Sequence, residues 1–87
     1  MTRRATKKML RRAEQALREQ RCFEAEEIYM TLMNHFESEP PSLLDYVACV
    51  FGLIRTFYAT NRDEEARALA YSAYLVLSDD QPVEVAA

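Results

Sequence analysis

Apolar side chains recur every three or four residues in four segments of the chain, and this spacing predicts four amphipathic α-helices. We expect these helices at about residues 3–19, 23–36, 43–60 and 63–78. The third segment is apolar over more than half of its circumference, so it must be covered on more than one side. One glycine and three prolines are too few for a hairpin-rich β fold. The pattern therefore predicts an all-α protein.

Turn and capping residues separate the predicted helices. Pro40 and Pro41 end the second helix, because proline breaks the hydrogen-bond ladder and restricts the residue before it. Ser42 is expected to cap the third helix, with Asp45 three residues further on as a partial capping box. Asn61 interrupts the pattern before the fourth helix begins. The helix boundaries are thus marked by turn chemistry as well as by periodicity.

Two stretches, residues 20–32 and 61–73, resemble each other at an offset of 41 residues, as from Ala25 to Ala66. A helix–turn–helix unit that repeats at this length is typical of an α-solenoid, in which each unit stacks on the next, rather than of a closed bundle. The matched pairs are Arg21 with Arg62, Glu24 with Glu65, Ala25 with Ala66, Ile28 with Leu69, Tyr29 with Ala70, and Leu32 with Ala73.

These residues resemble the tetratricopeptide repeat (TPR) family, in which each unit is a pair of antiparallel helices. The second helix of a unit in that family has a small residue, an aromatic residue four positions on, and a small or apolar residue three further. Ala25, Tyr29 and Leu32 match this pattern. The second unit has Ala66, Ala70 and Ala73 at these positions, and the first helices match at Ala13 and Phe57.

The resemblance implies one domain over residues 1–87, built as a two-unit TPR-like α-solenoid. Small residues at the helix crossings would let two backbones approach closely. Unit one would span about residues 3–36, a loop residues 37–42, unit two about residues 43–78, and an irregular tail residues 79–87.

The resemblance implies a scaffold that binds another protein in a groove lined by the first helix of each unit. The implied function is an adaptor or chaperone that holds a helical or extended client segment. Carried over by repeat alignment, the groove residues are Lys7, Leu10, Glu14, Leu17, Arg18, Ala48, Phe51, Arg55 and Tyr58.

One subfamily grips the C-terminal tails of chaperones through a carboxylate clamp made of lysine and asparagine. This chain has Leu10 and Glu14 at the corresponding positions, which argues against that ligand. In size, acidity and expected fold the chain also resembles the small TPR-like chaperones of type III secretion systems. That narrower resemblance implies a dedicated chaperone or co-chaperone.

Apolar residues surround the last two predicted helices nearly completely, so a second surface is expected there. Large side chains left in water would favour association, because their burial is strongly favourable. Either a second copy of the chain or a protein partner is expected to cover them, unless residues 81–87 fold back. The candidate cap or oligomer surface consists of Tyr71, Tyr74 and Leu75.

Charge is unevenly distributed, since residues 1–22 hold eight basic and two acidic residues of a chain whose net charge is −3. The first helix carries a basic ridge, which is either a solvated face partly paired with Glu24, Glu26 and Glu27, a site for an acidic protein, or a nucleic-acid site. We disfavour nucleic acid, because residues 1–22 contain no aromatic side chain for base stacking. The ridge consists of Arg3, Arg4, Lys7, Lys8, Arg11 and Arg12.

The sequence carries no recognisable catalytic motif, and we expect neither an enzyme nor a cofactor. Cys22 and Cys49 lack the spacing of a redox or zinc motif, and His35 is the only histidine. We expect no metal site. No run of apolar residues is long enough to cross a membrane, and the basic start lacks the apolar core of a signal peptide, so we expect a cytoplasmic protein without membrane insertion.

Overall fold

The computed structural model describes residues 2–78, and within this range the protein is entirely α-helical. The predicted all-α fold is therefore confirmed, with each of the four expected segments forming one helix. The tail predicted for residues 79–87 lies outside the described residues. The helices are α1 (Arg3–Arg18), α2 (Cys22–Ser38), α3 (Leu43–Ala59) and α4 (Asp63–Ser78).

Helix α2 is longer than the periodicity predicted, since it begins one residue earlier and continues past Phe36 to Ser38. Its end is set by Glu39, whose backbone is extended (φ −131°, ψ 95°) and whose amide still donates to the His35 carbonyl. Pro40 follows directly, and a residue before proline is pushed out of the helical region. The turn chemistry was therefore a better guide to this boundary than the apolar pattern.

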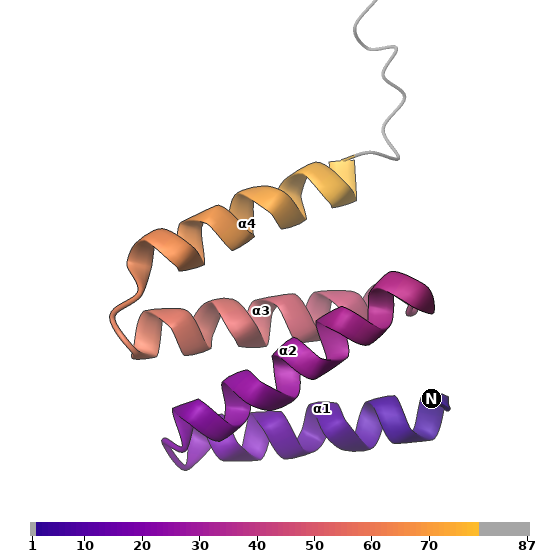
Figure 1. Ribbon diagram of the computed structural model, residues 1–87, viewed down its shortest axis with the longest axis horizontal. Helices are drawn as coiled ribbons and strands as arrows, with labels where there is room; N and C mark the ends of the chain where they lie inside the picture. Colours follow the sequence, from indigo (N-terminus) through magenta and orange to yellow (C-terminus); the bar gives the residue numbers. More distant parts are fainter. Residues whose placement is uncertain (1, 79–87) are drawn as a thin grey trace, which may run out of the picture.

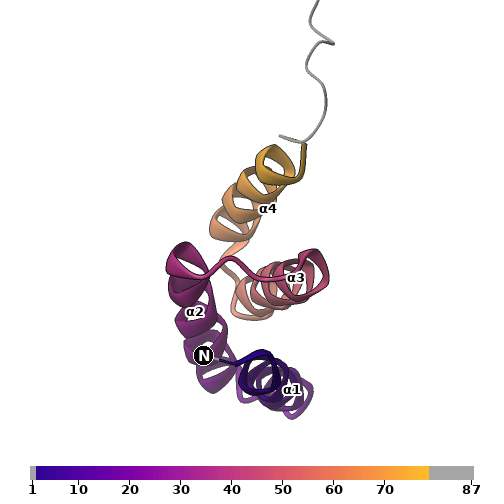
Figure 2. The ribbon, with the colours of Figure 1, turned by 90° about the vertical axis from the view of Figure 1, so that its right-hand side faces the viewer.

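The helices pack in an open sequence rather than as a closed bundle. Within the described chain α1 contacts α2 and α3, α2 contacts α3, and α4 contacts α3 alone. Figure 1 shows α4 at the opposite end of the molecule from α1. Viewed end-on in Figure 2, α1 and α3 lie on one side, with α2 packed against both from the other. The α1 and α3 helices thus form a surface of their own.

Side-chain caps fix the starts of two helices. The Thr2 Oγ1 accepts a 3.0 Å hydrogen bond from the Ala5 amide at the start of α1. The Ser42 Oγ accepts a 3.2 Å bond from the Asp45 amide at the start of α3, as predicted. Each bond satisfies one of the amides that a helix start leaves without an intrahelical partner.

The turn between α1 and α2 is a Schellman motif. Gln20 adopts the left-handed conformation, with φ 63°. Its amide donates to the Leu17 carbonyl at 3.0 Å, and the Arg21 amide donates to the Ala16 carbonyl at 2.8 Å. These two bonds satisfy carbonyls at the helix end and reverse the chain direction within a few residues.

The turn between α3 and α4 has the same construction, displaced by the 41-residue offset of the sequence repeat. Asn61 is left-handed, with φ 61°. Its amide donates to the Tyr58 carbonyl at 3.1 Å, and the Arg62 amide donates to the Phe57 carbonyl at 2.8 Å. The internal repeat is therefore a repeat of backbone geometry.

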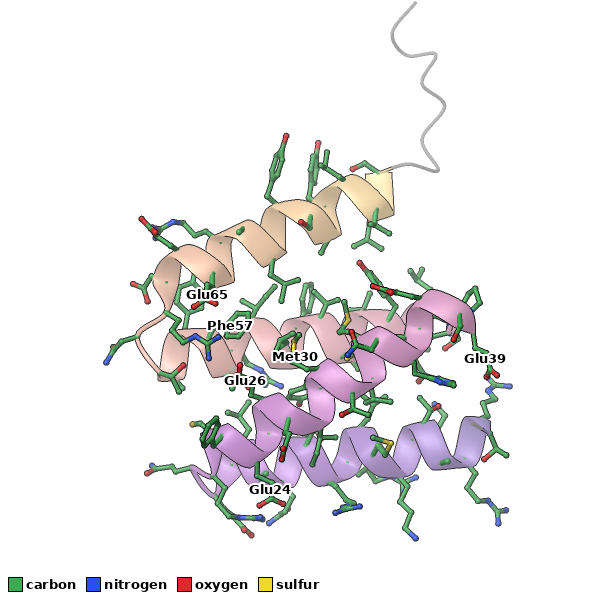
Figure 3. All side chains as sticks on the ribbon, viewed as in Figure 1. Glu24, Glu26, Met30, Glu39, Phe57 and Glu65 are labelled. Atoms are coloured by element: carbon green, nitrogen blue, oxygen red, sulfur yellow. The ribbon has the colours of Figure 1, made fainter. Side chains whose placement is uncertain are left out.

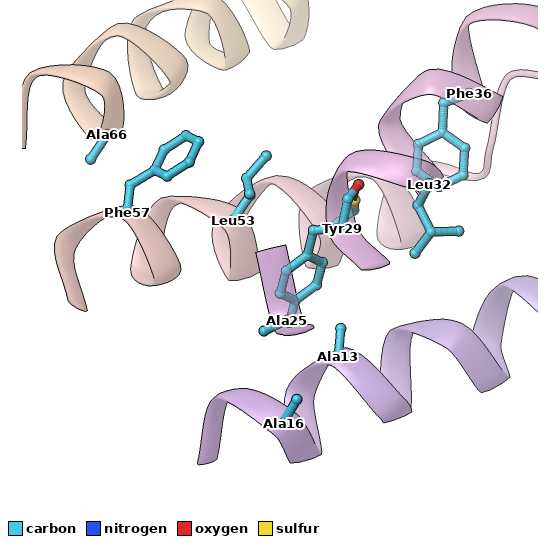
Figure 4. Close-up of a cluster of buried hydrophobic side chains, with 10 residues drawn as sticks. Ala13, Ala16, Ala25, Tyr29, Leu32, Phe36, Leu53, Phe57 and Ala66 are labelled. Atoms are coloured by element: carbon cyan, nitrogen blue, oxygen red, sulfur yellow. Dashed lines mark hydrogen bonds between the residues drawn. The ribbon is translucent and has the colours of Figure 1, made fainter. Parts of the chain in front are cut away.

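Several alanines are completely buried where helices pack against one another. Ala13 and Ala16 of α1 and Ala25 of α2 are completely buried and lie together between the two helices (Figure 4). Ala66 on α4 is completely buried as well. Because alanine has no side-chain atom beyond Cβ, the backbones can come close there.

Over residues 2–78, none of the helices combines the length and the apolar character that crossing a bilayer requires.

Candidate functional site

Two cavities lie along the surface formed by α1 and α3. One, of about 280 Å³, lies near the start of α1, and the other, of about 480 Å³, lies near its end. Glu14 lines both cavities. We call the two cavities together the α1–α3 groove. Its lining residues are Lys7, Leu10, Arg11, Glu14, Leu17, Arg18, Tyr29, Leu44, Asp45, Ala48, Arg55 and Ala59.

Most of the groove residues expected from the sequence line this groove. Phe51 and Tyr58 do not; they lie further round α3 with about half of their surface exposed (51% and 48%). Sequence reasoning missed several lining residues, including Arg11 from the basic ridge and Tyr29 from α2. The sequence placed Tyr29 only at the aromatic position of the repeat pattern, which gives no information on how far its ring extends.

The Tyr29 ring reaches the groove by passing α3 at Gly52. A Cβ atom at position 52 would lie 2.2 Å from the Tyr29 Cζ and 2.3 Å from its hydroxyl oxygen. The glycine is therefore required for space, although it weakens the helix by about 1 kcal/mol relative to alanine. Burial raises the pKa of Tyr29, while the nearby Arg55 guanidinium acts in the opposite direction. The phenol stays neutral at physiological pH.

An ion pair links the two helices that line the groove. The Lys7 Nζ lies 3.2 Å from the Asp45 Oδ1, and the Asp45 side chain is only 7% exposed. Removing the lysine would leave a nearly buried carboxylate without its cation, which is far more costly than losing a surface ion pair. Lys7 therefore helps to position α1 on α3.

Three arginines surround the apolar part of the groove. Arg11 and Arg55 make no ion pair with any described residue, and Arg18 donates a 3.0 Å hydrogen bond to Gln15. Leu10 and Leu17 supply aliphatic surface between them. An apolar floor with a polar rim is the usual anatomy of a surface that binds another protein.

The basic ridge is not neutralised by the carboxylates at the start of α2. Glu24 pairs with Arg21 instead, and Glu26 pairs with Arg62 at 2.6 Å. The expectation of partial pairing was wrong because α1 and α2 are antiparallel. The start of α2, with Glu24 and Glu26, lies beside the end of α1, whereas the ridge begins at the opposite end (Figure 3).

Arg62, in the turn between α3 and α4, contacts three helices. Its guanidinium makes two bonds to Glu65, of 2.7 and 3.0 Å, bonds Glu26 of α2, and lies 4.4 Å from the centre of the Phe57 ring. The hydrogen bonds from Arg62 lower the pKa of Glu65. Every strong contact of this guanidinium is internal, so we assign Arg62 to the architecture and not to binding.

The predicted apolar surface on α4 is exposed. Tyr71, Tyr74 and Leu75 have exposed fractions of 64%, 62% and 50%, and Val76 joins them at 55%. A separate cavity of about 490 Å³ opens where the ends of α2 and α4 meet the start of α3. It is lined by Met33, Phe36, Glu37, Pro41, Leu43, Tyr46, Val76 and Leu77.

The thiols and the histidine lie in ordinary structural settings. The buried Cys49 thiol donates to the Tyr29 carbonyl at 3.5 Å, and burial raises its pKa to about 12. Cys22 is the first residue of α2 and is half-buried. The His35 Nε2 lies 3.1 Å from the Glu39 Oε1. Among residues 2–78, no group of histidine, cysteine and carboxylate side chains has a metal-binding arrangement.

Comparison of the chain with known protein families, with curated proteins and with solved structures found no match.

Proposed function

We propose that the chain is a two-unit TPR-like α-solenoid that binds a helical or extended segment of a protein partner in the α1–α3 groove, without catalysis. The observation that carries this proposal is the groove itself, which combines the side chains of Leu10 and Leu17 with an arginine rim on a layer formed by α1 and α3. The repeated Schellman turns and the open order of helix contacts support the solenoid assignment.

The groove favours a segment with apolar anchors and nearby carboxylates. Leu10 and Leu17 lie seven residues apart, which places them on one face of α1 two turns from each other. A bound helix would set its own apolar stripe against them, while Arg11, Arg18 and Arg55 would meet acidic side chains at the edges. This is the helix-in-groove mode of recognition.

The exposed apolar surface of α4 supports an adaptor or chaperone role over that of an isolated domain. Tyr71 and Tyr74 project large rings into solvent from a helix that contacts only α3 within the described chain. Contiguous exposed apolar surface of this kind marks interaction sites in soluble proteins. A client that extends beyond the groove would bury it.

The test is selection of binding peptides from a random library on the immobilised chain, followed by affinity measurements with two matched variants. Ala48→Arg fills the groove, and Ala68→Arg makes the same change at an exposed position on α4. We expect Ala48→Arg to weaken the selected peptides at least tenfold and Ala68→Arg to leave them unchanged, with both variants equally helical. Equal affinity for both variants would refute the groove as the binding site.

A further inference from the structure

The first turn of α1 carries basic residues, whereas the first turns of the other three helices carry acidic ones. A helix start carries a partial positive charge that favours acidic residues and disfavours cations. The first turns of α2, α3 and α4 contain Glu24, Asp45 and Asp63 respectively. The first turn of α1 has no acidic residue and contains Arg3 and Arg4 instead.

The cations of α1 also repel one another. They form doublets that recur every four residues, so Arg4, Lys8 and Arg12 follow each other at one-turn spacing, about 6 Å apart along the axis. Like charges at this spacing destabilise a helix. Lys7 is the one ridge residue with a carboxylate partner among the described residues.

An arrangement that weakens its own helix without internal compensation is expected at functional sites. We infer that the outer face of α1, formed by Arg4, Lys8 and Arg12 with their doublet partners Arg3 and Arg11, binds an acidic helix of a protein partner. The carboxylates of that helix would recur once per turn. Any two α-helices have the same rise per turn, so a parallel or antiparallel acidic helix meets each doublet in succession.

The chemistry around this face favours protein over the other polyanions. Residues 1–22 contain no aromatic side chain on which a base could stack. Met9 and Leu10, the nearest large apolar residues, lie on the side of α1 that packs against the core and lines the groove, so this face offers no large apolar side chain to a lipid surface. The inference goes beyond the proposed groove function, because Arg4, Lys8 and Arg12 do not line the groove, and Arg11 is the one residue that the two surfaces share.

The experiment measures binding of an alanine-based helical peptide with glutamate at every fourth position. Its companions are a scrambled peptide of the same composition, a short DNA duplex, and phosphatidylserine-containing vesicles. The protein variants are Lys8→Glu and the matched charge reversal Arg67→Glu, which changes an exposed arginine of α4. The Ala48→Arg groove variant is included, and it should bind the acidic peptide as the wild type does.

We expect the ordered acidic peptide to bind, with an affinity that falls as salt rises. Lys8→Glu should weaken it at least tenfold, because the new carboxylate would lie against the carboxylates of the acidic peptide. Arg67→Glu should change it less than about twofold. Lys8→Glu should also raise the melting temperature, since the new carboxylate attracts Arg4 and Arg12 at one-turn spacing. Loss of binding then cannot be attributed to unfolding.

Several results would overturn the inference. The first is that the ordered peptide does not bind, or that it binds wild type and Lys8→Glu equally. The second is tighter binding of the DNA duplex or of the vesicles than of the peptide. The third is equal affinity for the ordered and the scrambled peptide, which would show that spacing does not matter.

Discussion

The contact between Gly52 and Tyr29 gives the sharpest prediction about stability. In an exposed helix interior, replacing glycine by alanine stabilises the fold by about 1 kcal/mol. At position 52 the added Cβ would lie 2.2 Å from the Tyr29 Cζ, whereas ordinary van der Waals contacts are 3.4–4 Å. The two groups must therefore separate by more than an ångström within a packed core, where the Tyr29 side chain is only 1% exposed.

The magnitude follows from two opposing effects. Overpacking in a core costs about 1–3 kcal/mol, and a rigid ring pressed against a helix backbone belongs at the upper end of that range. The higher helix propensity of alanine offsets about 1 kcal/mol of this cost. We therefore expect Gly52→Ala to lower the free energy of unfolding by about 2 kcal/mol.

The assay is urea unfolding followed by far-ultraviolet circular dichroism. Ala48→Gly, one turn earlier on the same helix and exposed, reports the propensity effect alone and should cost about 1 kcal/mol. In a Tyr29→Leu background, which removes the ring, Gly52→Ala should become stabilising. If Gly52→Ala alone raised stability by about 1 kcal/mol, the ring could not occupy the space beside α3.

Three further predictions concern turns, pH and thiols. Gln20→Gly should stabilise the protein by about 1 kcal/mol in urea unfolding, because glycine adopts the left-handed conformation without strain; a loss of stability would contradict the turn geometry. Arg62 lowers the pKa of Glu65, so this contact stabilises the fold above the ordinary carboxyl pKa and is lost as the pH falls through the lowered value. The melting temperature of the Arg62→Gln variant should therefore fall less between about pH 5 and pH 2 than that of the wild type. Parallel curves of melting temperature against pH would disprove the coupling between Arg62 and Glu65. Since burial raises the pKa of Cys49 to about 12, a disulfide reagent at neutral pH should modify Cys22 first and Cys49 only on unfolding; equal rates would contradict its burial.

The sequence was sufficient for the elements of the fold because local chemistry determines them. Apolar periodicity located all four helices, and Ser42 caps α3 as predicted. The offset between Ala25 and Ala66 located a repeat that extends to the backbone of both turns. Both alanines are completely buried, as close packing of the helices requires.

Long-range contacts were harder to predict, because they depend on where helices lie relative to one another. The acidic residues of α2 were expected beside the ridge, but the antiparallel turn places them at the other end of α1. The Lys7–Asp45 pair joins residues far apart in sequence, and no local pattern marks it. Tyr29 lines the groove only because Gly52 of another helix leaves room for its ring.

The most direct test of the central claim is amide chemical-shift mapping of the ¹⁵N-labelled chain titrated with a library-selected peptide. The largest shifts should lie on the facing sides of α1 and α3, around Leu10, Leu17 and Ala48, and they should disappear in the Ala48→Arg variant. Shifts confined to α4 around Tyr71 and Tyr74 would instead place the binding surface at the exposed end of the stack and contradict the groove.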